Sequence, residues 1–149
     1  MSHTYSSLLV HYIFSTKNRE RSIPNDVQPR LWSYMGGIAR KNRMKALAIG
    51  GVADHCHLLI SLPTNLDVAH AIQLIKAGSS KWMHEEIGRK RFAWQENYGA
   101  FTIGVSQVTA TVKYINTQKE HHKKRGFDAE LRMILRKHGI ALQEDLSRP

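Results

Sequence analysis

The sequence predicts an α+β fold in which one antiparallel sheet has helices on one face and further helices follow at the C-terminal end. Two observations carry this prediction. Short runs rich in β-branched and aromatic residues alternate with long segments whose apolar residues recur at helical spacing. The expected order is strand 7–14, helix 24–42, strand 44–52, strand 55–62, helix 66–87, strand 100–105, helix 107–124 and helix 127–138.

The first half of the chain supplies three strands and a helix. Residues 7–14 read SLLVHYIF, a run rich in β-formers. Strand 44–52 reaches an irregular end at Gly50-Gly51, and strand 55–62 follows closely enough to pair with it as a hairpin. Between them and the first strand, helix 24–42 places apolar residues at helical spacing, namely Val27, Leu31, Tyr34, Met35 and Ile38.

The second half begins where Pro63-Thr64-Asn65 breaks the chain before helix 66–87. Helix 107–124 follows strand 100–105, and the last helix ends in basic residues before Gly139, an expected stop signal. The resulting order, β-α-β-β-α-β with a helical tail, is the ferredoxin-like split βαβ plan. We therefore expect a single domain over residues 1–149, with a helical tail from about residue 127.

Composition and charge narrow the class of protein. The chain has 149 residues and 42% hydrophobic residues, enough for one compact domain. A single cysteine excludes a disulfide framework, and no apolar run approaches the roughly 18 residues of a membrane span. No secretory signal is visible, so we expect a cytoplasmic protein. Lysine and arginine number 22 against 12 acidic residues, a formal charge of +10 that predicts an anionic partner, with nucleic acid the leading candidate.

His55 and His57 form half of a possible metal site. A strand alternates faces with period two, so the two imidazoles point the same way, while Cys56 and Leu58 point to the opposite, apolar face. Paired imidazoles are common metal ligands. A structural role for this pair remains an alternative at this point.

Helix 107–124 carries a polar stripe beside its apolar one. Val108, Val112 and Ile115 form the apolar stripe, and Tyr114 lies off it. Gln118 stands one turn beyond Tyr114 on the same face. A tyrosine on a helix is usually a packing residue. The combination with two histidines in a basic protein nevertheless favours a shared site.

These residues resemble the motifs of the single-tyrosine HUH transposases, the small IS200-like type that includes repeat-associated tyrosine transposases. Segment 54–63 (DHCHLLISLP) resembles the HUH motif, with Cys56 in the apolar slot, and 114–118 (YINTQ), followed by His121-His122, resembles the tyrosine helix. Further resemblance lies in SHTY at 2–5, FSTK at 14–17, WQ at 94–95 and YGAF at 98–101, so it runs from about residue 2 to 125.

The resemblance implies strand transfer on single-stranded DNA with hairpin ends, through a 5′-phosphotyrosine intermediate. It implies Tyr114 as the nucleophile and His55, His57 and Gln118 as ligands of a divalent ion, Mg or Mn. It further implies a homodimer in which the tyrosine helix of one subunit completes the histidine site of the other. The expected DNA contacts are Lys17, Arg19, Arg21 and Lys113, with more basic residues (Lys119, Lys123, Lys124 and Arg125) at the end of the tyrosine helix.

Several alternatives stay open from the sequence. His121 or His122 could replace Gln118 as a ligand, because each lies within one turn of it. The chain could be a non-catalytic single-stranded nucleic-acid binder on the same fold, a domesticated relative acting on repeated palindromes, or a metal-dependent hydrolase that uses activated water. Phe92 and Trp94 could stack on bases, although core packing is favoured, and His11 is expected to be a satisfied sheet residue.

Overall fold

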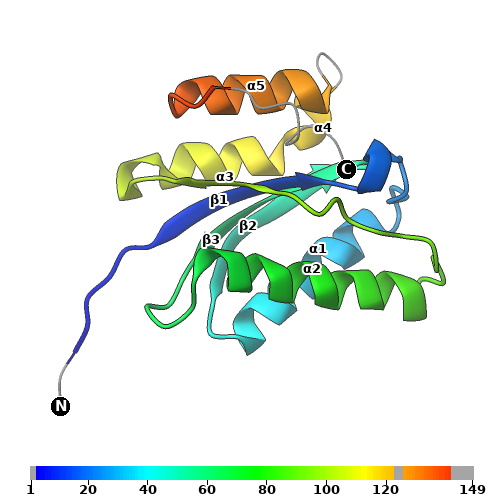
Figure 1. Ribbon diagram of the computed structural model, residues 1–149, viewed down its shortest axis with the longest axis horizontal. Coiled ribbons are helices and arrows are strands. Elements are labelled where there is room, and N and C mark those ends of the chain that lie inside the picture. The colour runs from blue at the N-terminus through cyan, green and yellow to red at the C-terminus, as the bar shows by residue number, and fades with distance from the viewer. Residues whose placement is uncertain (1–2, 123–125, 142–149) are drawn as a thin grey trace.

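A four-stranded antiparallel sheet forms the centre of the protein, as the computed structural model of residues 3–122 and 126–141 shows (Figure 1). The strand order is β2-β3-β1-β4. This order confirms the predicted α+β fold with a ferredoxin-like split arrangement. The strands are β1 (Leu9–Ser15), β2 (Lys45–Val52), β3 (His55–Ser61) and β4 (Gly99–Thr102).

Helices lie on both faces of this sheet (Figure 1). One face is covered by α1 (Gln28–Lys41) and α2 (Val68–Glu85). The C-terminal helices α3 (Val108–Asn116), α4 (Gln118–His121) and α5 (Phe127–Lys137) lie over the other. Short 3-10 turns, η1 (Lys17–Arg19) and η2 (Val105–Gln107), follow β1 and precede α3. Among the described helices, none is both long and apolar enough to cross a membrane.

The helix predicted over 107–124 is two helices separated at Thr117. The Thr117 backbone has φ −114° and ψ 28°, outside the α-helical range, and its hydroxyl donates to the Lys113 carbonyl at 2.8 Å. Gln118 therefore begins a new, short helix rather than continuing the face of Tyr114. The predicted basic residues Lys123, Lys124 and Arg125 lie outside the described residues.

The alternation of β3 separates an apolar core from a polar layer. Cys56 and Leu58 face the core under α1 and α2, as predicted. His55, His57 and Leu59 face the opposite layer, where α3 and α5 pack. Trp94 and Phe92 belong to the buried core, which confirms the favoured expectation that both residues serve packing and not base stacking.

Gly50 lets α3 approach the sheet. A Cβ atom at Gly50 would lie 2.5 Å from the backbone oxygen of Ile115, closer than real contacts allow. The strand and the helix that carries Tyr114 can therefore meet only because this position has no side chain. Gly51 instead lies against β3, since a Cβ there would clash with the His55 backbone oxygen. The prediction of an irregular strand end at Gly50-Gly51 is wrong, because both residues pair regularly with β3 and the register shift lies between Ala46 and Ala48.

We expect Gly50→Ala to lower the free energy of unfolding by about 1–3 kcal/mol, because the backbone of α3 must move away from β2. Urea denaturation measures this change. Gly37→Ala is the matched control, since its Cβ would meet only the Arg40 side chain at 3.8 Å and alanine favours the helix. Equal stability of Gly50→Ala and the wild type would contradict the close docking of α3.

Candidate active site

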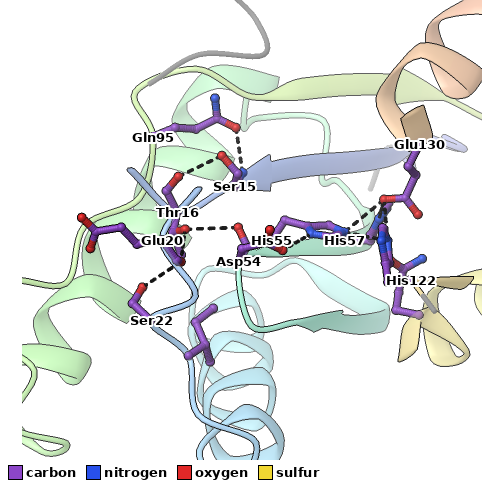
Figure 2. Close-up of polar contacts among 12 residues, drawn as sticks. Ser15, Thr16, Glu20, Ser22, Asp54, His55, His57, Gln95, His122 and Glu130 are labelled. Atoms are coloured by element: carbon purple, nitrogen blue, oxygen red, sulfur yellow. Dashed lines mark hydrogen bonds and ion pairs between the residues drawn. The ribbon is translucent and has the colours of Figure 1, made fainter. Parts of the chain in front are cut away.

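His55 and His57 point from β3 into the layer between the sheet and the C-terminal helices, as Figure 2 shows. Neither side chain is exposed to solvent. The Nε2 atoms of His55 and His57 lie 3.1 Å and 2.9 Å from the same carboxylate oxygen, Oε1 of Glu130. The two imidazoles therefore converge on one point, as the two-residue spacing in a strand predicted.

Two further side chains complete this cluster. His122, directly after α4, places its Nε2 at 2.9 Å from Nε2 of His55 and at 3.1 Å from Oε1 of Glu130. The ligand atoms of all four residues lie within 4.8 Å of one another. We call His55, His57, His122 and Glu130 the histidine–glutamate cluster. Three imidazole nitrogens and one carboxylate oxygen form a donor set that fits a divalent ion.

Outer hydrogen bonds hold the two strand histidines in place. Nδ1 of His55 lies 2.7 Å from Oδ1 of Asp54, and Nδ1 of His57 lies 2.9 Å from Nε2 of His11. Partners of this kind fix the ring orientation and leave the other nitrogen free for a metal. His11 is a sheet residue with a hydrogen-bond partner, as predicted, and that partner is His57 of the candidate site.

The turn that carries Asp54 is anchored by Thr16 (Figure 2). The Thr16 backbone N–H donates to the Asp54 carbonyl at 2.8 Å, and its hydroxyl donates to the Glu20 carbonyl at 2.6 Å. Thr16 is fully buried. The FSTK segment at the end of β1 therefore acts on the site indirectly, by positioning the carboxylate that orients His55.

The electrostatics differ between the two strand histidines. Burial alone would lower the pKa of His55, but hydrogen bonds with Asp54 and Glu130 outweigh it and raise this pKa. Burial lowers the pKa of His57, and its interaction with Glu130 only partly offsets this effect. Burial would raise the pKa of Glu130, yet hydrogen bonds with His122, His55 and His57 hold it well below its usual range. Glu130 is therefore an ionised carboxylate at neutral pH.

His11 stays neutral at physiological pH. Burial, with the neighbouring His57, lowers the pKa of His11 to about 3. A neutral imidazole can accept the hydrogen bond that fixes His57 in the tautomer needed for metal binding.

We expect His11→Phe to weaken Mn²⁺ binding by about tenfold, because the ring of His57 loses its orienting partner. Isothermal titration calorimetry measures this affinity. His70→Phe on the exposed surface of α2 is the control and should leave the affinity unchanged. An unaltered affinity in His11→Phe would mean that His57 needs no orientation from β1.

Tyr114 reaches the cluster from α3. Its hydroxyl donates a hydrogen bond to Oε2 of Glu130, and its ring packs edge-on to His57 with centroids 5.5 Å apart. The Tyr114 ring also stacks on the His121 ring, with centroids 4.7 Å apart. Within a single chain, Tyr114 therefore stands beside the histidine pair with which the sequence associated it.

Gln118 lies next to the cluster. Its side chain is buried, and its Oε1 lies 3.0 Å from Nε2 of His122. Its Nε2 donates to the carbonyl of Tyr114 at 3.3 Å. The role of Gln118 as a third ligand stays a prediction, while His122, kept open as an alternative, lies inside the cluster. Nε2 of His121 instead lies 3.0 Å from the hydroxyl of Thr117.

Glu130 is the site residue that sequence reasoning missed. It belongs to α5, the helix that the sequence predicts only as a C-terminal tail. A signal for it existed, because Glu130 falls three residues after Phe127 and four before Ile134, on the buried apolar face of that helix. A carboxylate on such a face requires a buried partner.

The four predicted DNA-contact residues differ in their surroundings. Arg19 forms an ion pair of 2.5 Å with Asp128 of α5, so it helps to seat that helix. Arg21 is exposed at the rim of a hollow that Asp54 and His122 also line. Lys17 is exposed in η1, and Lys113 is exposed on α3. Their contacts with DNA stay a prediction.

The sequence model of IS200-like transposases matches residues 4–118 of the chain. This chain belongs to the IS200-like transposase family. The matched segment contains His55, His57, Tyr114 and Gln118 and ends before His122 and Glu130. The family membership confirms the resemblance seen in the HUH and tyrosine motifs, and it makes the chain a transposase by family.

Two curated transposases are similar to this transposase in sequence. The transposase of insertion sequence IS200 from Salmonella typhimurium is 25% identical over 130 residues, covering 83% of this chain and 84% of the relative. The ISDra2 transposase TnpA from Deinococcus radiodurans is 22% identical over 116 residues, covering 74% of this chain and 83% of the relative.

Solved transposase structures share the fold. A protein from Deinococcus radiodurans R1, assigned as a transposase, matches with a TM-score of 0.64 at 20% identity, covering 79% of this chain and 96% of that one. A REP-associated tyrosine transposase, solved bound to a REP hairpin, matches with a TM-score of 0.56 at 17% identity, covering 77% of this chain and 70% of that one.

Proposed function

We propose that this transposase cleaves and rejoins single-stranded DNA through a 5′-phosphotyrosine intermediate on Tyr114, with a divalent metal ion at the histidine–glutamate cluster. The observation that carries the proposal is the position of the Tyr114 hydroxyl. It bonds to one oxygen of Glu130, while the other oxygen of the same carboxylate lies among three imidazole nitrogens. A nucleophile and a metal-binding donor set thus share one side chain.

The residues present fit a metal ion. His55 and His57 would hold it through Nε2, with His122, Glu130 and Gln118 available to complete its coordination. When bound, a divalent ion supplies positive charge that favours the phenolate and neutralises the phosphoryl oxygens. The abundance of imidazole favours Mn²⁺ over Mg²⁺, because Mg²⁺ prefers oxygen ligands.

The chemistry of the chain is a reversible exchange of phosphodiester bonds. Tyr114 Oη attacks phosphorus, the Oη–P bond forms, the P–O3′ bond breaks, and a 3′-hydroxyl leaves. A second 3′-hydroxyl then attacks the phosphotyrosine, which rejoins the DNA and frees Tyr114. A phenol with a pKa near 10 is a poor nucleophile by itself, so a divalent ion held by the histidine–glutamate cluster would supply the positive charge that favours the phenolate.

A cavity between α3 and α5 offers a route for the strand. It measures about 340 Å³ and opens on Tyr114 and His11. Lys137 and His138 line its rim together with Gln107 and Thr111. We propose that the DNA backbone tracks this basic rim and the exposed residues Lys17, Arg21 and Lys113, because each neutralised phosphate favours binding.

We propose hairpin-bearing single-stranded DNA as the substrate. The support is the charge of +10 and the fold shared with a relative that was solved on a REP hairpin. A homodimer with shared sites also stays a proposal. Because Tyr114 already meets the histidines of its own chain, sharing would require two chains to exchange their α3 helices.

The test is a covalent adduct. The protein is incubated with labelled single-stranded DNA fragments from its genomic neighbourhood, with Mn²⁺ or with a chelator, and resolved on a denaturing gel. We expect a metal-dependent protein–DNA adduct and a free 3′-hydroxyl. Turnover without an adduct would favour a hydrolase with activated water, and binding without cleavage would favour a non-catalytic binder.

A further inference from the structure

We propose that Glu130 is a catalytic residue that joins the nucleophile to the metal centre, supplied by a helix beyond the segment that the family model matches. The inference deepens the proposed function and rests on it. Helix α5 is then part of the active site, and the predicted boundary near residue 127 marks no functional division.

The geometry of the Glu130 carboxylate supports this role. Oε1 lies 3.1 Å from Nε2 of His55, 2.9 Å from Nε2 of His57 and 3.1 Å from Nε2 of His122. Oε2 accepts the hydrogen bond of the Tyr114 hydroxyl. Each oxygen therefore has a separate task, one at the donor set and the other at the reacting atom.

Packing alone does not explain a carboxylate at this position. Glu130 is fully buried, and burial of an unpaired carboxylate is strongly unfavourable. Helix α5 is seated by apolar contacts of Phe127, Leu131 and Ile134 in a cluster with Ile13 and Phe101 of the sheet. The ion pair between Arg19 and Asp128 adds to this seating. These contacts hold α5 without Glu130 and place its carboxylate in the cluster.

The hydrogen bond between the Tyr114 hydroxyl and Glu130 restricts the nucleophile to one place. Tyr114 lies on α3 next to Ile115, whose backbone docks against Gly50 of β2, so the backbone of Tyr114 is already held beside the sheet and its side chain remains to be oriented. A hydrogen bond to a fully buried carboxylate fixes Oη beside the cluster, where a bound phosphate would meet it. In the cleavage step the Oη–P bond forms and the P–O3′ bond breaks. The proton on Oη faces Glu130 Oε2 at the start and ends on the leaving O3′, so no net proton is consumed.

An alternative is that α5 merely covers the histidines and must leave before DNA binds. With α5 in place, Tyr114 and His11 line the cavity between α3 and α5, whereas His55, His57 and Glu130 are fully buried. The two readings also predict opposite results. Removal of the carboxylate slows cleavage if Glu130 is catalytic, and it accelerates or spares cleavage if α5 is only a cover.

The experiment compares Glu130→Gln and Glu130→Asp with two acidic controls, Asp128→Asn on the same helix and Glu120→Gln on the surface. Three quantities are measured on folded protein: Mn²⁺ affinity by calorimetry, affinity for hairpin-bearing single-stranded DNA, and the single-turnover rate of adduct formation at saturating DNA and Mn²⁺. We expect Glu130→Gln to lower Mn²⁺ affinity at least tenfold and the rate about 100-fold, with DNA affinity unchanged. Glu130→Asp should recover part of the Mn²⁺ affinity but little of the rate, because the shorter side chain cannot reach both partners.

The outcomes separate this inference from the proposed function. A rate in Glu130→Gln within threefold of the wild type, or above it, overturns the inference and leaves the phosphotyrosine mechanism standing. A similar loss in Asp128→Asn overturns it too, because the effect then comes from seating α5. If the wild type forms no adduct, the proposed function fails. The Mn²⁺ titration then tests the inference separately, and an unchanged Mn²⁺ affinity in Glu130→Gln overturns it.

Discussion

Tyr114→Phe is expected to abolish the covalent adduct with single-stranded DNA, with a loss of rate of at least about 10⁴-fold. Phenylalanine keeps the ring that packs against His57 and His121 but lacks the oxygen that we propose attacks phosphorus. The measurement is the single-turnover yield of adduct on a denaturing gel. DNA affinity, measured in parallel, should stay within about twofold, because the substitution removes no charge.

A matched control for this substitution is Tyr34→Phe. Tyr34 is exposed on α1, on the opposite side of the sheet, where it stacks on Trp82. It should retain full activity. An adduct that survives in Tyr114→Phe would assign the nucleophile to another residue and would remove the basis for the bridging role of Glu130.

Tyr114→Phe should also affect stability. Oε2 of Glu130 loses the donor that the Tyr114 hydroxyl supplies, inside a buried site. We expect a decrease in the free energy of unfolding of about 1–3 kcal/mol. Urea denaturation of the metal-free protein measures it, and a variant as stable as the wild type would contradict the hydrogen bond.

His57→Ala is expected to have the second largest effect, because this residue contributes to both chemistry and packing. It should lower Mn²⁺ affinity by about 100-fold or more and stop adduct formation, since one of the two strand histidines proposed as ligands is lost. It should also destabilise the fold by about 3 kcal/mol, since Glu130 and His11 both lose a buried partner.

Calorimetry with Mn²⁺ and urea denaturation test the two parts of this prediction separately. His70→Ala, on the exposed face of α2, is the control and should change neither quantity. Retention of Mn²⁺ affinity in His57→Ala would show that the ion binds elsewhere. A loss of affinity without a loss of stability would mean that His57 serves the metal alone.

Much of the fold and half of the site follow from local patterns. The alternation of β3 is enough to place His55 and His57 on one face and Cys56 and Leu58 on the other, because strand geometry has period two. The helical spacing of apolar residues likewise located α1 and α2. These patterns involve residues that are close in the sequence, so they can be read without knowing the tertiary structure.

The interruption of the tyrosine helix shows where such patterns fail. Helical spacing predicted one stripe from Tyr114 to Gln118, yet the helix stops at Asn116 and α4 begins at Gln118. The Thr117 hydroxyl bonds back to the Lys113 carbonyl, a local contact that competes with a regular helix and that the spacing of apolar residues does not reveal. The break brings His122 into the cluster and places Gln118 beside it.

By itself the sequence determined the sheet with its histidine pair, the tyrosine as candidate nucleophile, and nucleic acid as the favoured partner. Only the tertiary structure decided that Glu130, 73 residues from His57, completes the site. The physical reason is that a buried carboxylate needs partners, and those partners come from β3, α3 and the end of α4. No local pattern encodes which distant donors will meet an acidic residue on an apolar helix face, because the packing of α5 against the sheet sets that encounter.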